Sequence, residues 1–111
     1  MTITTKNLVP GKHLEATQTA QYTASGVKGV IDKCVITNTT AVEVKISINI
    51  VKKSTSAAAT NLILTEHIIA GKETYLCPEI IGVVLENGDF ISTLAGAASS
   101  LAINISGREI S

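Results

Sequence analysis

The sequence predicts one all-β domain, an antiparallel β-sandwich or jelly roll of about eight strands. Val, Ile and Thr, which suit a pleated and half-buried surface, make up about a third of the chain. Apolar residues make up 45% of the chain and charged residues 16%, a balance that favours a folded protein. Turn signals recur every ~8–12 residues, and no segment shows a helical period. The 111 residues suit one domain, residues 1–111.

The clearest strand is Val42 to Val51, where apolar and polar residues alternate strictly. This period of two is typical of a strand with one buried and one wet face. Glu43, Lys45, Ser47 and Asn49 are predicted to point outward, and Val42, Val44, Ile46, Ile48 and Ile50 inward.

The segment before it, Gly29 to Thr37, is predicted to be a central strand because both of its faces carry apolar residues. Its link to the next strand, Asn38 to Ala41, is short and rich in turn-forming residues, which predicts an antiparallel hairpin. The faces of the central strand, Gly29 to Thr37, are expected to hold Val30, Cys34 and Ile36 on one side and Ile31, Val35 and Thr37 on the other.

The Thr- and Gln-rich run His13 to Thr23 is predicted as another strand.

The second half reads as short strands separated by turns. Lys52 to Thr60 has only small or polar residues and is expected to be an exposed, mobile loop. The Asn-Gly pair within Glu86 to Asp89 marks the sharpest turn. Strands are predicted at Asn61 to Ile69, Glu73 to Cys77, Ile80 to Leu85, Phe90 to Leu94 and Leu101 to Ile105, the last with Leu101, Ile103 and Ile105 facing inward.

The charge balance restricts the range of partners. Nine basic and nine acidic residues cancel, which argues against a protein that binds nucleic acid or an anionic membrane directly. The longest apolar run, Ile80 to Leu85, is far shorter than the ~20 residues of a membrane-spanning helix. No signal peptide is recognisable at the N-terminus, so synthesis in the cytoplasm is expected.

Residues capable of catalysis or metal binding are few and scattered. His67 follows Glu66 along a strand, so the two side chains should point to opposite faces. A zinc site needs about four ligands, and the spacing of His13, His67, Cys34 and Cys77 does not favour one. The two cysteines are expected to be buried, reduced thiols. We therefore expect no catalytic, cofactor-binding or metal-binding residues and no enzyme; an enzyme would require His13 or His67 beside a thiol or carboxylate in a cleft.

Two further features bear on binding. Asp32 interrupts an apolar strand and is expected at an edge or paired with Lys33, Lys45 or Arg108. A carbohydrate- or receptor-binding sandwich is an alternative that predicts an exposed aromatic or acidic cluster, and the chain has only two Tyr, one Phe and no Trp.

Four segments between residues 31 and 110 carry a resemblance to a known group of proteins. They are Ile31 to Val44 with its Asn-Thr-Thr turn, Ile69 to Thr74 with Ala-Gly-Lys-Glu, Val84 to Ile91 with Leu-Glu-Asn-Gly-Asp, and Asn104 to Ile110 with Ser-Gly-Arg-Glu-Ile. In this order the chain resembles small structural proteins of tailed bacteriophages and prophages, which include capsid decoration (cement) proteins and β-sandwich tail or fibre modules.

The resemblance implies a repeated virion subunit that binds the major capsid protein or other virion proteins and forms a homo-oligomer, with no cofactor. A capsid decoration protein is the first interpretation, and a tail, neck or fibre-base module is the alternative. Residues 1–30 lie outside the resemblance, which leaves open a strand or an exchanged arm. Contact with other copies is expected through Met1 to Pro10 or through an edge strand, because strand edges invite pairing.

Overall fold

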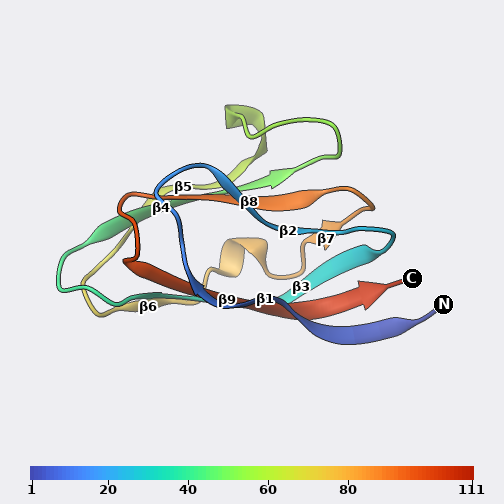
Figure 1. Ribbon diagram of the computed structural model, residues 1–111, viewed down its shortest axis with the longest axis horizontal. Coiled ribbons are helices and arrows are strands. Elements are labelled where there is room, and N and C mark those ends of the chain that lie inside the picture. Colours follow the sequence, from blue (N-terminus) through green and yellow to red (C-terminus); the bar gives the residue numbers. More distant parts are fainter.

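A computed structural model describes residues 1–111 and shows two antiparallel sheets packed face to face (Figure 1). The predicted sandwich is confirmed, with nine strands and two short 3-10 helices. Sheet A has the order β1-β9-β3-β6, with β7 also paired to β3, and sheet B has the order β2-β8-β4-β5. The elements are β1 (Ile3–His13), β2 (Thr19–Thr23), β3 (Lys28–Asn38), β4 (Val44–Val51), η1 (Ala59–Asn61), β5 (Leu62–Ile69), β6 (Thr74–Tyr75), η2 (Pro78–Ile80), β7 (Val84–Leu85), β8 (Phe90–Ala95) and β9 (Leu101–Ile110).

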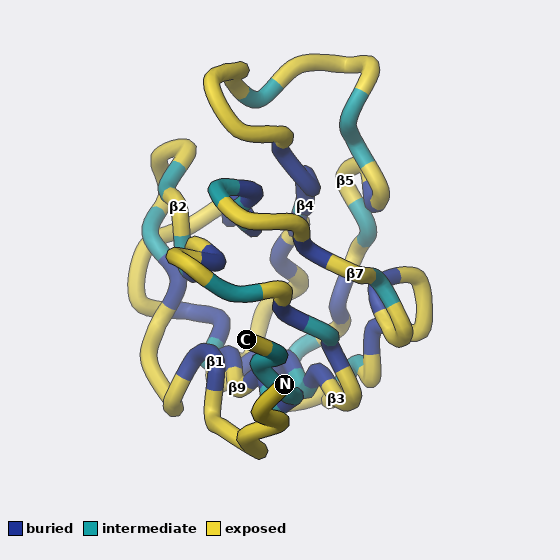
Figure 2. Tube along the Cα trace, turned by 90° about the vertical axis from the view of Figure 1, so that its right-hand side faces the viewer, coloured by how far each residue is buried: buried dark blue, intermediate teal, exposed yellow.

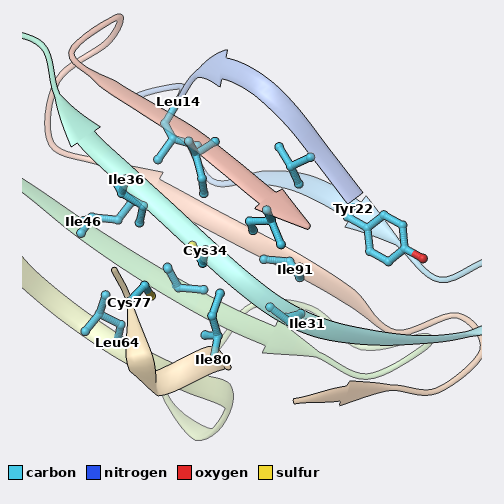
Figure 3. Packing of buried hydrophobic residues seen from close by; sticks show 14 of the residues in the cluster. Leu14, Tyr22, Ile31, Cys34, Ile36, Ile46, Leu64, Cys77, Ile80 and Ile91 are labelled. Atoms are coloured by element: carbon cyan, nitrogen blue, oxygen red, sulfur yellow. The ribbon is translucent and has the colours of Figure 1, made fainter. Parts of the chain in front are cut away.

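The core is one cluster of 22 buried residues between the sheets (Figures 2 and 3). The alternation predicted for β4 is confirmed for Val44, Ile46, Ile48 and Ile50, which are all buried. Val42 is 67% exposed, so its predicted inward position is wrong. The strand begins only at Val44, and Val42 lies in the link that precedes it. Leu101, Ile103 and Ile105 of β9 face inward as predicted.

β3 is central, as predicted, with β9 on one side and β6 and β7 on the other. Ile31 was expected on the face opposite Cys34 and Ile36, and this prediction is wrong, because all three side chains are fully buried in the core. A register shift opposite β9 between Ile31 and Lys33 reverses the alternation, because one extra residue turns the following side chains to the other face.

The predicted hairpin between β3 and β4 is also wrong. These strands belong to different sheets, and Asn38 to Ala41 begins a link that crosses from sheet A to sheet B. The turn predicted at Asn38 is nevertheless present, since Asn38 Oδ1 accepts hydrogen bonds from the Thr40 backbone N–H at 2.9 Å and from the Thr40 hydroxyl at 2.7 Å. Turn residues do not determine which sheet receives the next strand.

The first thirty residues form strands rather than a free arm. Ile3 to Pro10 belong to β1, which pairs with β9 along the edge of sheet A. The predicted strand His13 to Thr23 is wrong in its first half, because residues 14–18 carry the chain from sheet A to sheet B before β2 begins. Leu14 in this crossing is buried in the core.

Three other segments differ from their predictions. Ile80 to Leu85 is not one strand, since η2 ends at Ile80 and β7 covers only two residues; the run is apolar because Ile80 and Leu85 are both fully buried. The strand predicted at Glu73 to Cys77 is reduced to Thr74–Tyr75. Lys52 to Thr60 is an exposed loop that includes the start of η1.

The molecule measures 45 × 27 × 19 Å. Both termini lie at the same end of the long axis, where Thr2 and Ser111 exchange backbone hydrogen bonds of 3.0 and 2.9 Å (Figure 1). None of the helices has the length and apolar character needed to cross a membrane.

Candidate interaction surfaces

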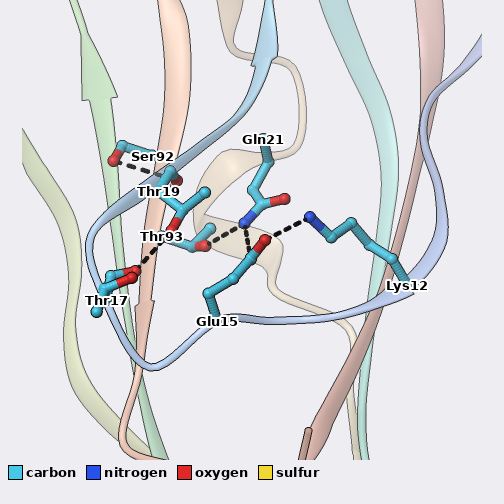
Figure 4. Close-up of polar contacts among 7 residues, drawn as sticks. All are labelled: Lys12, Glu15, Thr17, Thr19, Gln21, Ser92 and Thr93. Carbon is cyan, nitrogen blue, oxygen red and sulfur yellow. Dashed lines mark hydrogen bonds and ion pairs between the residues drawn. The ribbon is translucent and has the colours of Figure 1, made fainter. Parts of the chain in front are cut away.

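The crossing from sheet A to sheet B is held by Glu15 (Figure 4). Its carboxylate accepts hydrogen bonds of 2.9 Å from Lys12 Nζ and from Gln21 Nε2, and Gln21 Nε2 also donates to Thr93 Oγ1 at 2.9 Å. These bonds, led by the one from Lys12, lower the pKa of Glu15 to about 2. The cluster therefore joins the end of β1 to sheet B.

Neither of the two histidines lines a hollow in the surface. His13 is exposed at the end of β1. His67 stacks on Tyr75 with ring centroids 4.0 Å apart, and the Tyr75 hydroxyl lies 2.5 and 2.6 Å from the carboxylate oxygens of Glu79. Burial and this hydrogen bond raise the pKa of Tyr75, and the same bond lowers the pKa of Glu79. His67 and Tyr75 thus close the flank where β5 of sheet B meets β6 of sheet A.

Cys34 and Cys77 are both free and fully buried, as predicted. Their thiols face each other in the core, and the Cys77 thiol, together with burial, raises the pKa of Cys34. No group of three or more His, Cys, Asp or Glu side chains could hold a metal ion.

The outer face of sheet A carries an ion pair. Arg108 Nε and Nη2 each donate to Asp32 at 3.0 Å, so the predicted pairing of Asp32 with Arg108 is confirmed. Beside the pair lies an open hollow of about 430 Å³, lined only by polar residues and Gly107. An open site whose charges already pair with each other has little left to offer a small ligand.

The outer face of sheet B carries a groove made of two adjoining hollows of about 320 and 300 Å³. Both hollows are lined by Ser47 of β4, Glu66 of β5 and Leu94 of β8. Ala57 and Ala58 from the loop before η1 line one end, and Ala16 and Gly96 line the other.

Hydrogen bonds fix the walls of this groove. Asn49, buried at 3% exposure, donates to Ala58 O at 3.0 Å and to Asn61 Oδ1 at 2.7 Å, which anchors the loop to β4. Glu66 lies in a bulge of β5 with a φ of 43°, and its backbone N–H donates to Ser47 Oγ at 2.9 Å. A non-glycine residue in this left-handed region is uncommon, so the bulge is specified by its surroundings.

None of the aromatic side chains lines a hollow. Tyr22 is 9% exposed and donates to Glu109 Oε2 at 2.5 Å, while Tyr75 is engaged with His67 and Glu79. Phe90 is half-buried. The groove on sheet B therefore lacks an aromatic surface on which a sugar ring could stack.

The four outer edges of the two sheets differ in how well another strand could pair with them. β2 and β5 are interrupted by register shifts, and β6 and β7 have two residues each. The first half of β1 is regular, with an unbroken register from Ile3 opposite Ile110 to Asn7 opposite Ser106. Ile3 is 53% exposed and Met1 is 96% exposed beside this edge.

Comparison of the chain with models of protein families, with curated proteins and with solved structures finds no match.

Proposed function

We propose that the protein is a structural subunit of a bacteriophage virion, in the first instance a capsid decoration (cement) protein that acts by packing against a shell and against its own copies. The virion role is suggested by the resemblance of segments within residues 31–110 to structural proteins of tailed bacteriophages. Its structural support is the regular free edge at Ile3 to Asn7, which no other strand of the same chain covers.

The hydrogen-bond pattern shows which groups this edge offers. Thr2 and Ser111 bond each other in both directions. Because such pairs alternate along an antiparallel ladder, Thr4 and Lys6 also face β9, whereas Ile3, Thr5 and Asn7 direct their N–H and C=O groups away from it. Three consecutive outward positions allow a strand of a neighbouring subunit to extend sheet A.

The zero net charge and the pairing of Lys6 with Glu109 beside this edge fit the same role. Lys6 and Tyr22 both contact Glu109, at 3.4 and 2.5 Å, so the charged groups beside the edge already satisfy one another. A surface of this kind imposes little repulsion between copies of the same chain.

The role is tested by mixing purified protein with mature capsids that lack it and pelleting the particles. We expect saturable binding and capsids that resist heat better than undecorated ones. Absence of binding to capsids and to every other virion assembly would contradict a virion role. Negative-stain labelling distinguishes a decoration protein from the alternative tail, neck or fibre-base module by the position of the label.

The part played by the edge is tested separately with Thr5→Pro. Proline removes the outward N–H of Thr5 without removing a bond to β9, and proline is tolerated on an edge strand. Thr5→Val, which keeps the N–H, is the matched control. We expect the proline variant to lose self-association or capsid binding by at least tenfold while the valine variant retains both; equal behaviour of the two variants would contradict the edge as the contact.

The groove on sheet B favours a second candidate, a receptor- or carbohydrate-binding role. Its lining combines the Glu66 carboxylate with the hydroxyl groups of Ser47 and Thr65 and the amide of Gln18. The absence of an aromatic surface in the groove makes protein packing the better-supported proposal. Binding in a glycan array that is lost in Glu66→Ala would favour the second candidate instead.

A further inference from the structure

Two cysteines that lie 43 positions apart in the sequence are both buried in the core, Cys34 in β3 and Cys77 just after β6. β3 and β6 pair with Ile36 opposite Tyr75 and Thr37 opposite Thr74. The chain leaves this ladder at Tyr75, two residues before Cys77, just as Cys34 lies two residues before Ile36, so Cys77 comes close to Cys34 without pairing with it.

The side chains agree with this proximity. Cys34 and Cys77 are both fully buried members of the core cluster. Figure 3 shows them between the sheets, Cys34 from β3 and Cys77 from the segment that leads into η2. The influence of the Cys77 thiol on the pKa of Cys34 requires the two sulfur atoms to be neighbours.

The two cysteines differ in how firmly the chain holds them. Cys34 lies in the middle of β3, where it pairs with Ile105 of β9. Cys77 lies at a corner, with a left-handed φ of 44°, between the two-residue β6 and the three-residue η2. Its neighbours Leu76 and Pro78 are exposed, so this corner lies at the surface of the molecule.

We propose that Cys34 and Cys77 form an oxidisable dithiol that closes to an intramolecular disulfide when the protein meets a low-molecular-weight disulfide, fixing the corner before η2 to β3. The Cys77 thiolate attacks the small disulfide, forms a mixed disulfide and releases one small thiol. The Cys34 thiolate then attacks the Cys77 sulfur, forms the internal S–S bond and releases the second small thiol. The protein gives up two protons and two electrons, and the small disulfide is reduced to two thiols.

Both thiols remain reduced in a reducing compartment, and closure occurs after transfer to an oxidising one. The raised pKa of Cys34 keeps its thiolate scarce, so closure is slow. The inference does not depend on the proposed virion role, because it follows from the placement of the two thiols alone.

The test treats the wild-type protein with oxidised glutathione, alkylates the remaining free thiols under denaturing conditions and digests with trypsin. Cleavage after Lys33, Lys45, Lys72 and Arg108 leaves Cys34 in peptide 34–45 and Cys77 in peptide 73–108. We expect a linked pair of these peptides, a mass loss of about 2 Da for the intact chain, and a rise in Tm of roughly 5–15 °C that dithiothreitol reverses.

Cys34→Ala and Cys77→Ala are the matched controls. Neither variant can form the internal bond, so we expect no linked peptide and no rise in Tm after the same treatment. Recovery of both wild-type cysteines as alkylated or glutathione-capped residues, linkage only between separate chains, or an equal rise in Tm in the alanine variants would each overturn the proposal.

Discussion

The side-chain amide of Asn38 donates a hydrogen bond to the backbone carbonyl of Ile69 at 3.0 Å, and this bond joins the end of β3 in sheet A to the end of β5 in sheet B. The same nitrogen donates to Val42 O at 2.7 Å. Its oxygen accepts the two bonds from Thr40. Asn38 is fully buried, and these four hydrogen bonds satisfy both polar atoms of its side chain where the chain passes between the sheets.

Asn38→Ala should lower the free energy of unfolding by roughly 2–4 kcal/mol, because it removes four hydrogen bonds of a fully buried side chain, one of them to the buried carbonyl of Ile69. Chemical denaturation followed by circular dichroism measures this loss. Asn87→Ala is the control, since Asn87 is exposed and accepts one bond from the backbone of Gly26. A loss at Asn38 no larger than the loss at Asn87 would show that the crossing does not depend on this amide.

Gly107 is required by the close packing of β9 on β3. A Cβ atom at this position would overlap the carbonyl oxygen of Val30 and contact the side chain of Leu8 at 3.0 Å. Gly107→Ala should therefore destabilise the fold by about 2 kcal/mol or more, because a backbone carbonyl has to move.

Gly11→Ala is the matched control for this substitution. Its added Cβ would find only Asn104 Nδ2 at 3.9 Å, an ordinary contact, so the change in stability should stay within about 0.5 kcal/mol. Equal melting temperatures for the two alanine variants would contradict the packing described for β9.

The lowered pKa of Glu15 predicts part of the acid sensitivity of the fold. Its folded-state pKa of about 2 lies below the ordinary value of 4.5, so the ionised carboxylate stabilises the fold above pH 4.5, and this contribution is lost as the pH falls toward 2. The effect is small, because the side chain is 41% exposed and solvent screens its pairing with Lys12.

Thermal melts between pH 5 and pH 2 test this assignment. The wild-type Tm should fall more steeply over that range than the Tm of Glu15→Gln, which has no carboxylate to protonate. Parallel curves for the two proteins would assign the acid sensitivity to other carboxylates.

The sequence predicted those parts of the fold that depend on local alternation. β4 and β5 lie close to their expected positions because strict periodicity or Ile and Leu spacing marks them, whereas β9 begins at Leu101 as expected but continues to Ile110. The sequence does not predict the reversal of faces in β3, because the bulge near Asp32 can be recognised only from the pairing of β3 with β9. The hairpin expected after Asn38 failed for a related reason, because sheet assignment depends on distant partners.

The candidate surfaces were less accessible to sequence reasoning. The edge at Ile3 to Asn7 has a Thr-rich composition and little alternation, so only its pairing with β9 reveals it as a strand. The groove on sheet B is lined by Glu66, which lies in a bulge with a positive φ. The sequence does not predict this bulge, because the residue is not a glycine. The proximity of Cys34 and Cys77 depends on the pairing of β3 with β6, and a separation of 43 positions in the sequence does not predict it.

Electron cryomicroscopy of the parent virion tests the central proposal most directly. We expect density for this sandwich at repeated positions on the particle, with the edge formed by Ile3 to Asn7 in contact with a strand of a neighbouring subunit. A virion reconstruction in which the protein is absent from every structural layer, while the protein itself is present in infected cells, would rule out a role as a virion subunit.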